Sequence, residues 1–242
     1  MSEIYLSVII PAYNEEKRLP KTLKEINDYL RKQNFESEII VVSDGSTDRT
    51  CEIVENLKNQ ISNLKLICER INRGKGYGVK IGMLNAKGKY RLFTDADNST
   101  PISEIEKFWP EFEKGADVVI ASRDIKGAIL DPPQTLFRRF VGEVFKYLRK
   151  IIIGLWEIQD TQCGFKCFKG EVAEKIFLKC KIERFAFDPE VLLIAKKMGF
   201  KIKEVPVYWR NDPGSKVKFK WMVKMLIELF KIRLNFLTKK YG

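Results

Sequence analysis

The chain has 242 residues, 45% of them hydrophobic, and a net charge of +12. This length and apolar content suffice for one substantial core, so residues 1–242 are expected to form a single domain. The sequence contains no histidine, which excludes imidazole-dependent serine or cysteine catalysis and argues against a zinc site. No signal peptide or apolar stretch of membrane-spanning length is recognised, so a cytosolic location is expected.

The first half of the chain alternates strand-like and helix-like segments in chain order. Strands are predicted at 5–10, 38–42, 64–68, 90–94 and 117–121, and helices at 19–30, 47–57, 79–84 and 102–113. Ser46 or Thr47 is expected to cap the second helix. This alternation predicts an α/β fold with a mostly parallel sheet flanked by helices.

Two later segments are basic and amphipathic. Residues 126–156 carry six lysines or arginines against two acids, and residues 213–242 carry eight against one. Apolar residues recur at helical spacing within 135–156 and 219–240. Such helices are suited to lying on an anionic membrane surface, although the same apolar faces could instead pack on the core.

The five cysteines are an odd number with irregular spacing. This pattern argues against a disulfide framework and for a reducing compartment. Most of the cysteines are therefore expected to be small core residues.

Polar clusters follow the predicted strands at 11–16, 44–48, 95–97 and 122–123, and another at 73–76 opens the third helix. Because the carboxyl ends of parallel strands meet at one edge of a sheet, these clusters predict a single concave site for an anionic ligand. Arg73 and Lys75 are candidates for phosphate contacts. Asp95 and Asp97 have the hard oxygen ligands that Mg²⁺ or Mn²⁺ prefers, although two such acids also occur in solvated turns.

Several motifs in order resemble glycosyltransferase family 2, especially the branch that moves a hexose from a nucleotide sugar to dolichyl or another polyprenyl phosphate. They lie at 11–16, 160–166, 185–188, 205–207 and 214–216. The resemblance implies the Rossmann-like, nucleotide-sugar-binding GT-A fold, followed here by basic amphipathic helices. It also implies a nucleotide-sugar donor, a divalent metal and a lipid acceptor at the cytosolic face of a membrane.

The resemblance assigns roles to individual residues. Those expected around the nucleotide are Pro11, Tyr13, Glu15 and Asp44. Asp95 would lie near ribose, sugar or metal, and Asp97 would bind the metal that bridges the donor phosphates. Residues expected to neutralise donor or acceptor phosphate, or to line the sugar and acceptor region, are Arg123, Arg210, Lys216, Asp160 and Gln162. The catalytic set is thus Asp95, Asp97 and Arg123.

Two departures from the family pattern concern the donor. Ser43 stands where the family usually has the first of two acids, which leaves Asp44 alone. Ser99 stands where mannosyltransferases of the branch usually have glutamine. The absence of that glutamine, together with residues 184–188, favours UDP-glucose over GDP-mannose, which stays the alternative.

A phosphate monoester acceptor is already anionic near neutral pH, so this reaction needs no general base. A family 2 enzyme with a non-lipid acceptor would need one, and Asp160 or Asp188 could serve. A different alternative is a nucleic-acid-binding module, because basic and aromatic residues alternate within 216–241.

Overall fold

The computed structural model describes residues 3–133, 136–210 and 219–241, and the side chains in these ranges except at 136–141 and 219–222. Lys216 and the motif at 214–216 lie outside the described residues. The main sheet contains β1 (Leu6–Ala12), β2 (Ser37–Asp44), β3 (Leu64–Glu69), β4 (Tyr90–Thr94), β5 (Val118–Ser122), β7 (Phe165–Lys169) and β8 (Ile202–Pro206). A separate ribbon pairs β6 (Ile129–Asp131) with β9 (Tyr208–Arg210).

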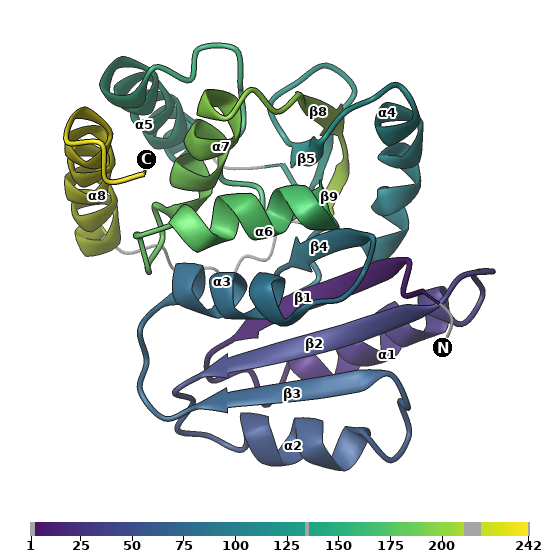
Figure 1. Ribbon diagram of the computed structural model, residues 1–242. Helices are drawn as coiled ribbons and strands as arrows, with labels where there is room; N and C mark the ends of the chain where they lie inside the picture. The colour runs from purple at the N-terminus through teal and green to yellow at the C-terminus, as the bar shows by residue number, and fades with distance from the viewer. Residues whose placement is uncertain (1–2, 134–135, 211–218, 242) are drawn as a thin grey trace.

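The helices are α1 (Leu19–Leu30), α2 (Thr50–Leu57), α3 (Lys75–Asn85), α4 (Trp109–Glu113), α5 (Leu136–Ile153), α6 (Gly170–Lys179), α7 (Phe187–Lys197) and α8 (Phe219–Leu237), with a 3-10 helix at Ile102–Lys107. In Figure 1, α5 and α8 lie at the end of the molecule away from β3 and α2.

The seven strands of the main sheet follow the order β3-β2-β1-β4-β7-β5-β8. Only β7 runs antiparallel to its neighbours, β4 and β5. The predicted α/β fold with a mostly parallel sheet is therefore confirmed. Strand β1 is buried along its whole length, because helices cover both faces of the sheet.

Two apolar clusters fill the space on the two faces. One joins α3, α6, α7 and the inward face of α8, and the other joins α1, α2, the 3-10 helix and α4. Both basic segments form helices, and α5 contacts α8. The single domain expected over residues 1–242 stays a prediction.

Helix α1 and strand β4 have the predicted bounds, whereas the other three predicted helices differ. The helix predicted at 79–84 is longer in the structure, where α3 runs from Lys75 to Asn85. The predicted helix at 102–113 is divided near Phe108, because Pro110 lacks an N–H group and its ring clashes with the preceding turn. The prediction that Ser46 or Thr47 caps the second helix was wrong. Thr47 N–H donates instead to Asn14 Oδ1, and α2 begins only at Thr50.

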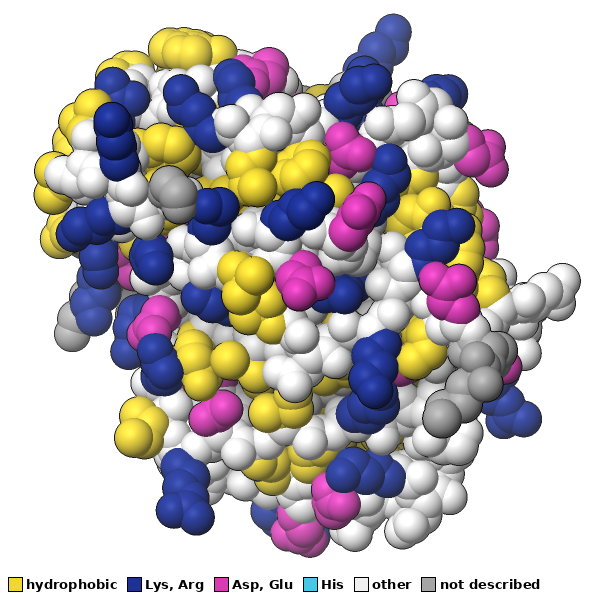
Figure 2. Space-filling model, in the orientation of Figure 1, with side chains coloured by type: hydrophobic (Ala, Val, Ile, Leu, Met, Phe, Trp, Pro, Cys, Tyr) yellow, Lys and Arg dark blue, Asp and Glu magenta, His cyan; other side chains and the backbone are white. Residues whose placement is uncertain are grey.

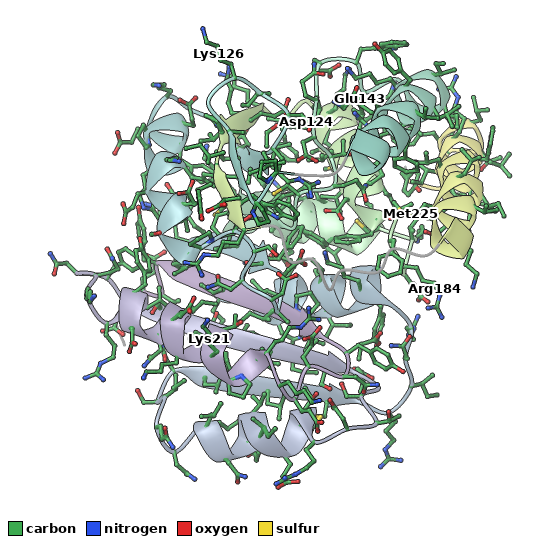
Figure 3. The ribbon with its side chains drawn as sticks, turned by 180° about the vertical axis from the view of Figure 1, so that it is seen from behind. Lys21, Asp124, Lys126, Glu143, Arg184 and Met225 are labelled. Atoms are coloured by element: carbon green, nitrogen blue, oxygen red, sulfur yellow. A yellow bond between two sulfur atoms is a disulfide. The ribbon has the colours of Figure 1, made fainter. Side chains whose placement is uncertain are left out.

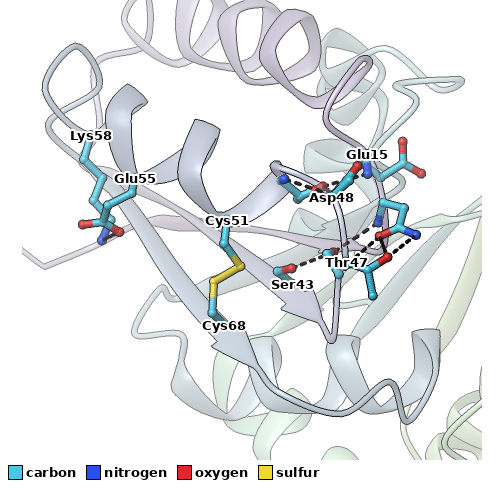
Figure 4. The surroundings of a disulfide bond; sticks show 11 residues. Glu15, Ser43, Thr47, Asp48, Cys51, Glu55, Lys58 and Cys68 are labelled. Atoms are coloured by element: carbon cyan, nitrogen blue, oxygen red, sulfur yellow. Dashed lines mark hydrogen bonds and ion pairs between the residues drawn. A yellow bond between two sulfur atoms is a disulfide. The ribbon is translucent and has the colours of Figure 1, made fainter.

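The expectation for the cysteines was wrong for one pair. Cys51 of α2 and Cys68 of β3 form a disulfide across a sequence separation of 17 (Figure 4). Helix α2 packs back against its neighbouring strand, and this tertiary contact is invisible in the cysteine spacing. The expectation of buried core residues is confirmed for Cys163, Cys167 and Cys180.

The double substitution Cys51→Ser/Cys68→Ser is expected to lower the free energy of unfolding by about 3 kcal/mol, because a disulfide closing a loop of this size restricts the unfolded chain. Chemical denaturation with and without reductant measures the effect. Reductant should destabilise the original protein and leave the double variant unchanged. Five reactive thiols in the unreduced, unfolded protein would contradict the pairing.

Candidate active site

Asp95 follows β4 and lies where three chain segments meet. Its Oδ1 is 2.5 Å from the ammonium of Lys75 at the start of α3. A Cβ at Gly164 would lie 2.0 Å from Asp95 Oδ2, so the segment before β7 packs directly against this carboxylate, and a side chain at 164 would displace it. The predicted clusters at 73–76 and 95–97 are therefore brought together, along with the 160–166 motif.

Asp97 lies in the turn that follows. Its Oδ1 accepts the backbone N–H of Ser99 at 3.0 Å, and Asn98 between them has φ 50°. Within the described ranges, no group of three or more Asp, Glu, Cys or His side chains could hold a metal ion. Two carboxylates nevertheless fit Mg²⁺ or Mn²⁺ at a diphosphate, because these ions commonly use one or two protein carboxylates and take water and phosphate oxygens for the rest.

Lys75 is surrounded by negative charge. Burial disfavours its ammonium form, but the carboxylates of Asp95, Asp188 and Asp97 outweigh burial and raise the pKa of Lys75. Lys75 therefore stays protonated at neutral pH.

A second lysine, Lys166 of β7, is fully buried behind the site. Its Nζ donates to Asp188 Oδ1 and to the carbonyl oxygen of Cys163, each at 2.5 Å. Burial raises the pKa of Asp188, although Lys166 and Lys75 act in the opposite direction. Sequence reasoning gave Lys166 no role. Strand β7 contains two lysines, Lys166 and Lys169, and nothing in the local sequence indicates that Lys166 is the buried one.

Arg123 and Asp160 form an ion pair in which Asp160 is buried and the Arg123 side chain is 20% exposed. Asp160 is 4% exposed and accepts the backbone N–H and Nε of Arg123 at 3.0 and 2.7 Å through Oδ2, and Nη2 at 3.1 Å through Oδ1. Burial alone would raise the pKa of Asp160, but Arg123 holds it well below its ordinary value. The guanidinium of Arg123 also lies 5.2 Å from the ring centre of Trp209.

Asp160 also fixes the loop that contains it. Its Oδ1 accepts the backbone N–H groups of Gln162 and Cys163 at 2.9 and 3.1 Å. Two buried polar atoms of this loop, Thr161 Oγ1 and Gln162 Nε2, have no hydrogen-bond partner in the described part of the chain. The predicted sugar and acceptor residue Gln162 thus has a free donor, whereas Asp160 is occupied by protein groups.

Two residues missed by sequence reasoning hold the backbone around this loop in place by hydrogen bonds. Glu204 of β8 accepts the backbone N–H groups of Gln159 and Asp160 at 2.8 and 2.9 Å. Arg149 of α5 is 1% exposed and donates to the carbonyl oxygens of Leu155 and Ile158 at 3.3 and 3.0 Å. Nothing in their local sequence distinguishes these side chains from surface charges.

Asp44, at the end of β2, organises the start of α3. Its carboxylate accepts the backbone N–H of Arg73 at 3.0 Å and that of Gly74 at 2.6 Å. The side chain of Arg73 pairs with Glu183 and lies 4.0 Å from the ring centre of Tyr77. The predicted phosphate contact of Arg73 would therefore compete with an existing ion pair.

The predicted nucleotide residues of β1 and the loop after it lie beside the loop that follows Asp44. Pro11 belongs to β1, and the Tyr13 side chain is 48% exposed. Burial raises the pKa of Glu15, against the effect of Arg18, and the nearby Asp97 adds to the rise. Figure 4 shows the adjoining loops tied together, with Glu15 N–H donating to Thr50 Oγ1 at 2.9 Å.

Arg210 of β9 lies next to the turn that contains Asp97. Its backbone N–H donates to the carbonyl oxygen of Ser99 at 2.7 Å, and its Nη1 lies 3.6 Å from Glu25 Oε2. The structure therefore brings Arg210 to the same edge of the sheet as Asp95 and Asp97. Lys216, the remaining predicted phosphate residue, lies outside the described residues.

Comparisons with known proteins are consistent with this architecture. A dolichyl-phosphate beta-glucosyltransferase of Trichomonas vaginalis is 38% identical over 98% of this chain and 76% of its own length. The human protein of the same name is 35% identical over 96% and 76%. Glucosyl-3-phosphoglycerate synthase of Mycobacterium tuberculosis, solved with Mn²⁺, UDP and phosphoglyceric acid, shares the GT-A fold with a TM-score of 0.65 at 17% identity, covering 99% of this chain and 79% of that one.

The family profile described as glycosyl transferase family 2 matches residues 7–177, most of the chain. Together with the near-full-length similarity to curated relatives, this match shows that the chain belongs to glycosyltransferase family 2.

Proposed function

We propose that this enzyme transfers glucose, with inversion, from UDP-glucose to dolichyl or another polyprenyl phosphate. Curated relatives with the name dolichyl-phosphate beta-glucosyltransferase support this assignment over nearly the whole chain. The choice of a phosphate acceptor rests on the burial and hydrogen bonding of Asp160 and Asp188, the two carboxylates considered as general bases.

Neither carboxylate is placed to remove a proton from a sugar hydroxyl. Asp160 is covered by Arg123 and by backbone N–H groups, and its lowered pKa makes it a weak base. Asp188 is 3% exposed and its Oδ1 is held by buried Lys166. An acceptor phosphate, which is already ionised near neutral pH, removes the need for a base.

The chain's own residues would then position two anions. The acceptor phosphate oxygen attacks the anomeric carbon as the bond from that carbon to the donor diphosphate breaks, and the leaving nucleotide diphosphate takes the bonding electron pair. Lys75, whose Nζ lies 2.5 Å from Asp95 Oδ1, would neutralise donor phosphate. Arg123 and Arg210 would attract the acceptor phosphate.

Asp97 and Asp95 would hold Mg²⁺ or Mn²⁺ at the donor diphosphate. Bound there, the metal stabilises negative charge on the leaving group. Lys75 would have to release Asp95 from their ion pair for both carboxylates to bind the ion.

Transfer of labelled sugar into organic-extractable lipid tests the proposal directly. UDP-glucose and GDP-mannose are each incubated with polyprenyl phosphate, with and without EDTA. We expect metal-dependent lipid labelling from UDP-glucose. Labelling only from GDP-mannose would change the donor, and nucleotide-sugar binding without lipid product would point to a different acceptor.

The outward faces of α5 and α8 support a membrane location for this reaction. No helix among the described residues is long and apolar enough to cross a bilayer. Large apolar side chains on these two helices are nevertheless 37–67% exposed: Val144, Tyr147, Leu148, Ile151, Val223, Ile227, Phe230, Leu234 and Leu237. Figure 2 shows hydrophobic and basic side chains interspersed over the same region.

An anionic lipid surface matches the charge of this region. Exposed cations of α8 and the residues after it include Lys231, Arg233, Lys239 and Lys240. The only acid within 219–241 is Glu228, and its carboxylate accepts an N–H from the protein body at 3.0 Å. We therefore propose that α5 and α8 rest on the cytosolic face of a membrane, where the polyprenyl tail is held.

Ile227→Ser is expected to weaken binding to phosphatidylserine-containing vesicles by about tenfold, because burial of one such side chain contributes about 1.5 kcal/mol. Co-sedimentation at several lipid concentrations measures the change. Ile129→Ser is the matched control, because Ile129 of β6 is 59% exposed and Ile227 is 63% exposed. Equal loss in both variants, or dimerisation of the protein through this surface in place of lipid binding, would contradict the proposed membrane contact.

A further inference from the structure

Residues 180–190 join α6 to α7 and include the first turn of α7. This segment contacts both the loop at 73–76, on the donor side of the site, and helix α8. It contains the start of α7 and Asp188, which acts electrostatically on Lys75. Two separate sets of contacts, one at each side of the segment, make it a physical connection between α8 and the loop at 73–76.

On the donor side, the contact is between backbones. Tyr77 N–H donates to the carbonyl oxygen of Glu183 at 2.9 Å. A Cβ at Gly74 would lie 2.6 Å from that carbonyl oxygen, and a Cβ at Gly76 would lie 2.6 Å from Phe187 Cβ. There is no free space between the two segments, so a displacement of 182–187 moves the start of α3 and Lys75 with it.

On the other side, Glu228 of α8 and Tyr241, four residues beyond the end of α8, hold the same segment by hydrogen bonds. Glu228 Oε2 accepts the backbone N–H of Ala186 at 3.0 Å. Tyr241 OH donates to Oε1 of Glu190 at 2.5 Å. Glu190 is fully buried and also accepts the backbone N–H groups of Lys181 and Ile182 at 3.0 and 2.9 Å.

The side chains of α8 divide between the core and the exterior. Leu229 and Ile232 are fully buried, whereas Ile227, Phe230 and Leu234 are more than half exposed. In water, this outward apolar face stays exposed in the docked helix. A lipid surface would cover it while Leu229 and Ile232 keep packing on the core, and would thereby help to hold the helix in place. Figure 3 shows Met225 of α8 and Arg184 of segment 180–190 on the same side of the molecule.

We propose that Glu228 and Tyr241 are positioning residues that transmit the docking of α8 on a lipid surface to the donor loop, so that lipid binding strengthens nucleotide binding. The inference rests on the proposed function. A lipid surface that holds α8 in place orders segment 182–187 before the nucleotide binds, and the nucleotide then loses less free energy in ordering Lys75. Donor binding would thereby be favoured where the lipid acceptor is present.

Calorimetric titration of UDP in the presence of Mn²⁺, with and without vesicles of phosphatidylcholine and phosphatidylserine, tests this coupling. For the original protein, we expect vesicles to tighten UDP binding about fivefold or more, in the usual range for coupled sites. For Glu228→Ala, which removes the oxygen that accepts the N–H of Ala186, and for Tyr241→Phe, the ratio of the two affinities should fall to about one while co-sedimentation with vesicles is retained. In steady-state assays on vesicles, both variants should raise the donor KM and leave kcat unchanged.

Glu143→Ala is the matched control for Glu228→Ala. Glu143 lies on α5, its carboxylate is 54% exposed and it pairs with Lys146, so the vesicle effect should persist in this variant. Equal UDP affinity with and without vesicles, in an original protein that co-sediments with them, would overturn the coupling and leave the proposed reaction standing. Absence of UDP binding under both conditions would overturn the proposed function and this inference together.

Discussion

Asp97→Asn is expected to lower the rate of sugar transfer by about a thousandfold and leave the protein folded. A neutral amide is a much weaker ligand than a carboxylate for Mg²⁺ or Mn²⁺, and stabilisation of charge on a leaving group contributes several kcal/mol to catalysis. The Asp97 side chain is partly exposed, and its Oδ1 accepts one backbone N–H, from Ser99. An amide oxygen can accept the same hydrogen bond, so the turn should be preserved.

The measurement is single-turnover transfer at several metal concentrations, with the unfolding midpoint as the control for folding. Asp97→Glu keeps the charge and should retain part of the activity at high metal concentration. Near-normal transfer by Asp97→Asn at limiting metal would remove Asp97 from the proposed metal site.

Asp160→Asn is expected to lower the free energy of unfolding by about 3–5 kcal/mol and to abolish transfer. Removing one partner of a buried ion pair leaves the other charge without compensation, and here the remaining charge is Arg123. Asp160 also accepts the N–H groups that shape its loop, so the geometry around Gln162 would be lost as well.

The double variant Asp160→Asn/Arg123→Met separates stability from function. Removing both charges should recover most of the lost stability, because neither charge is then left buried alone. Transfer should stay abolished if Arg123 attracts the acceptor phosphate. Chemical denaturation of the original protein and both variants measures these differences, and a double variant as unstable as Asp160→Asn would contradict the ion-pair explanation.

The contribution of Asp160 to stability should depend on pH in a defined direction. Because the folded-state pKa of Asp160 is well below its ordinary value near 4, the stabilisation is fully present above about pH 4 and is lost as pH falls toward the folded-state pKa. The stability difference between the original protein and Asp160→Asn should therefore be constant from neutral pH down to about pH 5 and shrink below pH 4. Denaturation series at these pH values measure it.

The sequence was sufficient for the elements that carry their own local signals. Helix α1 and strand β4 have the predicted bounds because an amphipathic repeat and a short apolar run are local patterns. The edge of the sheet where Asp44, Asp95 and Asp97 gather follows from the rule that parallel strands end on the same side. Those residues could be located before any contact between them was known.

The remaining features depend on contacts between distant segments. Strand β7 follows α5 in sequence and lies between β4 and β5, and no local pattern indicates that position. The burial of Lys166 and Arg149, and the pairing of Cys51 with Cys68, likewise arise from packing. Sequence reasoning placed Asp160 near the sugar, but most of its hydrogen-bonding capacity is used by Arg123 and backbone groups.

The position of β7 has a consequence for how the chain acquires its fold. Strands β1, β2 and β3 can pair soon after synthesis, because they are close in sequence and adjacent in the sheet. Strand β5 has no neighbour among the strands that precede it, since its partners β7 and β8 begin only at Phe165 and Ile202. During synthesis, the apolar residues of β5 therefore lack their strand partners, and stay prone to aggregation, until the last third of the chain has been made.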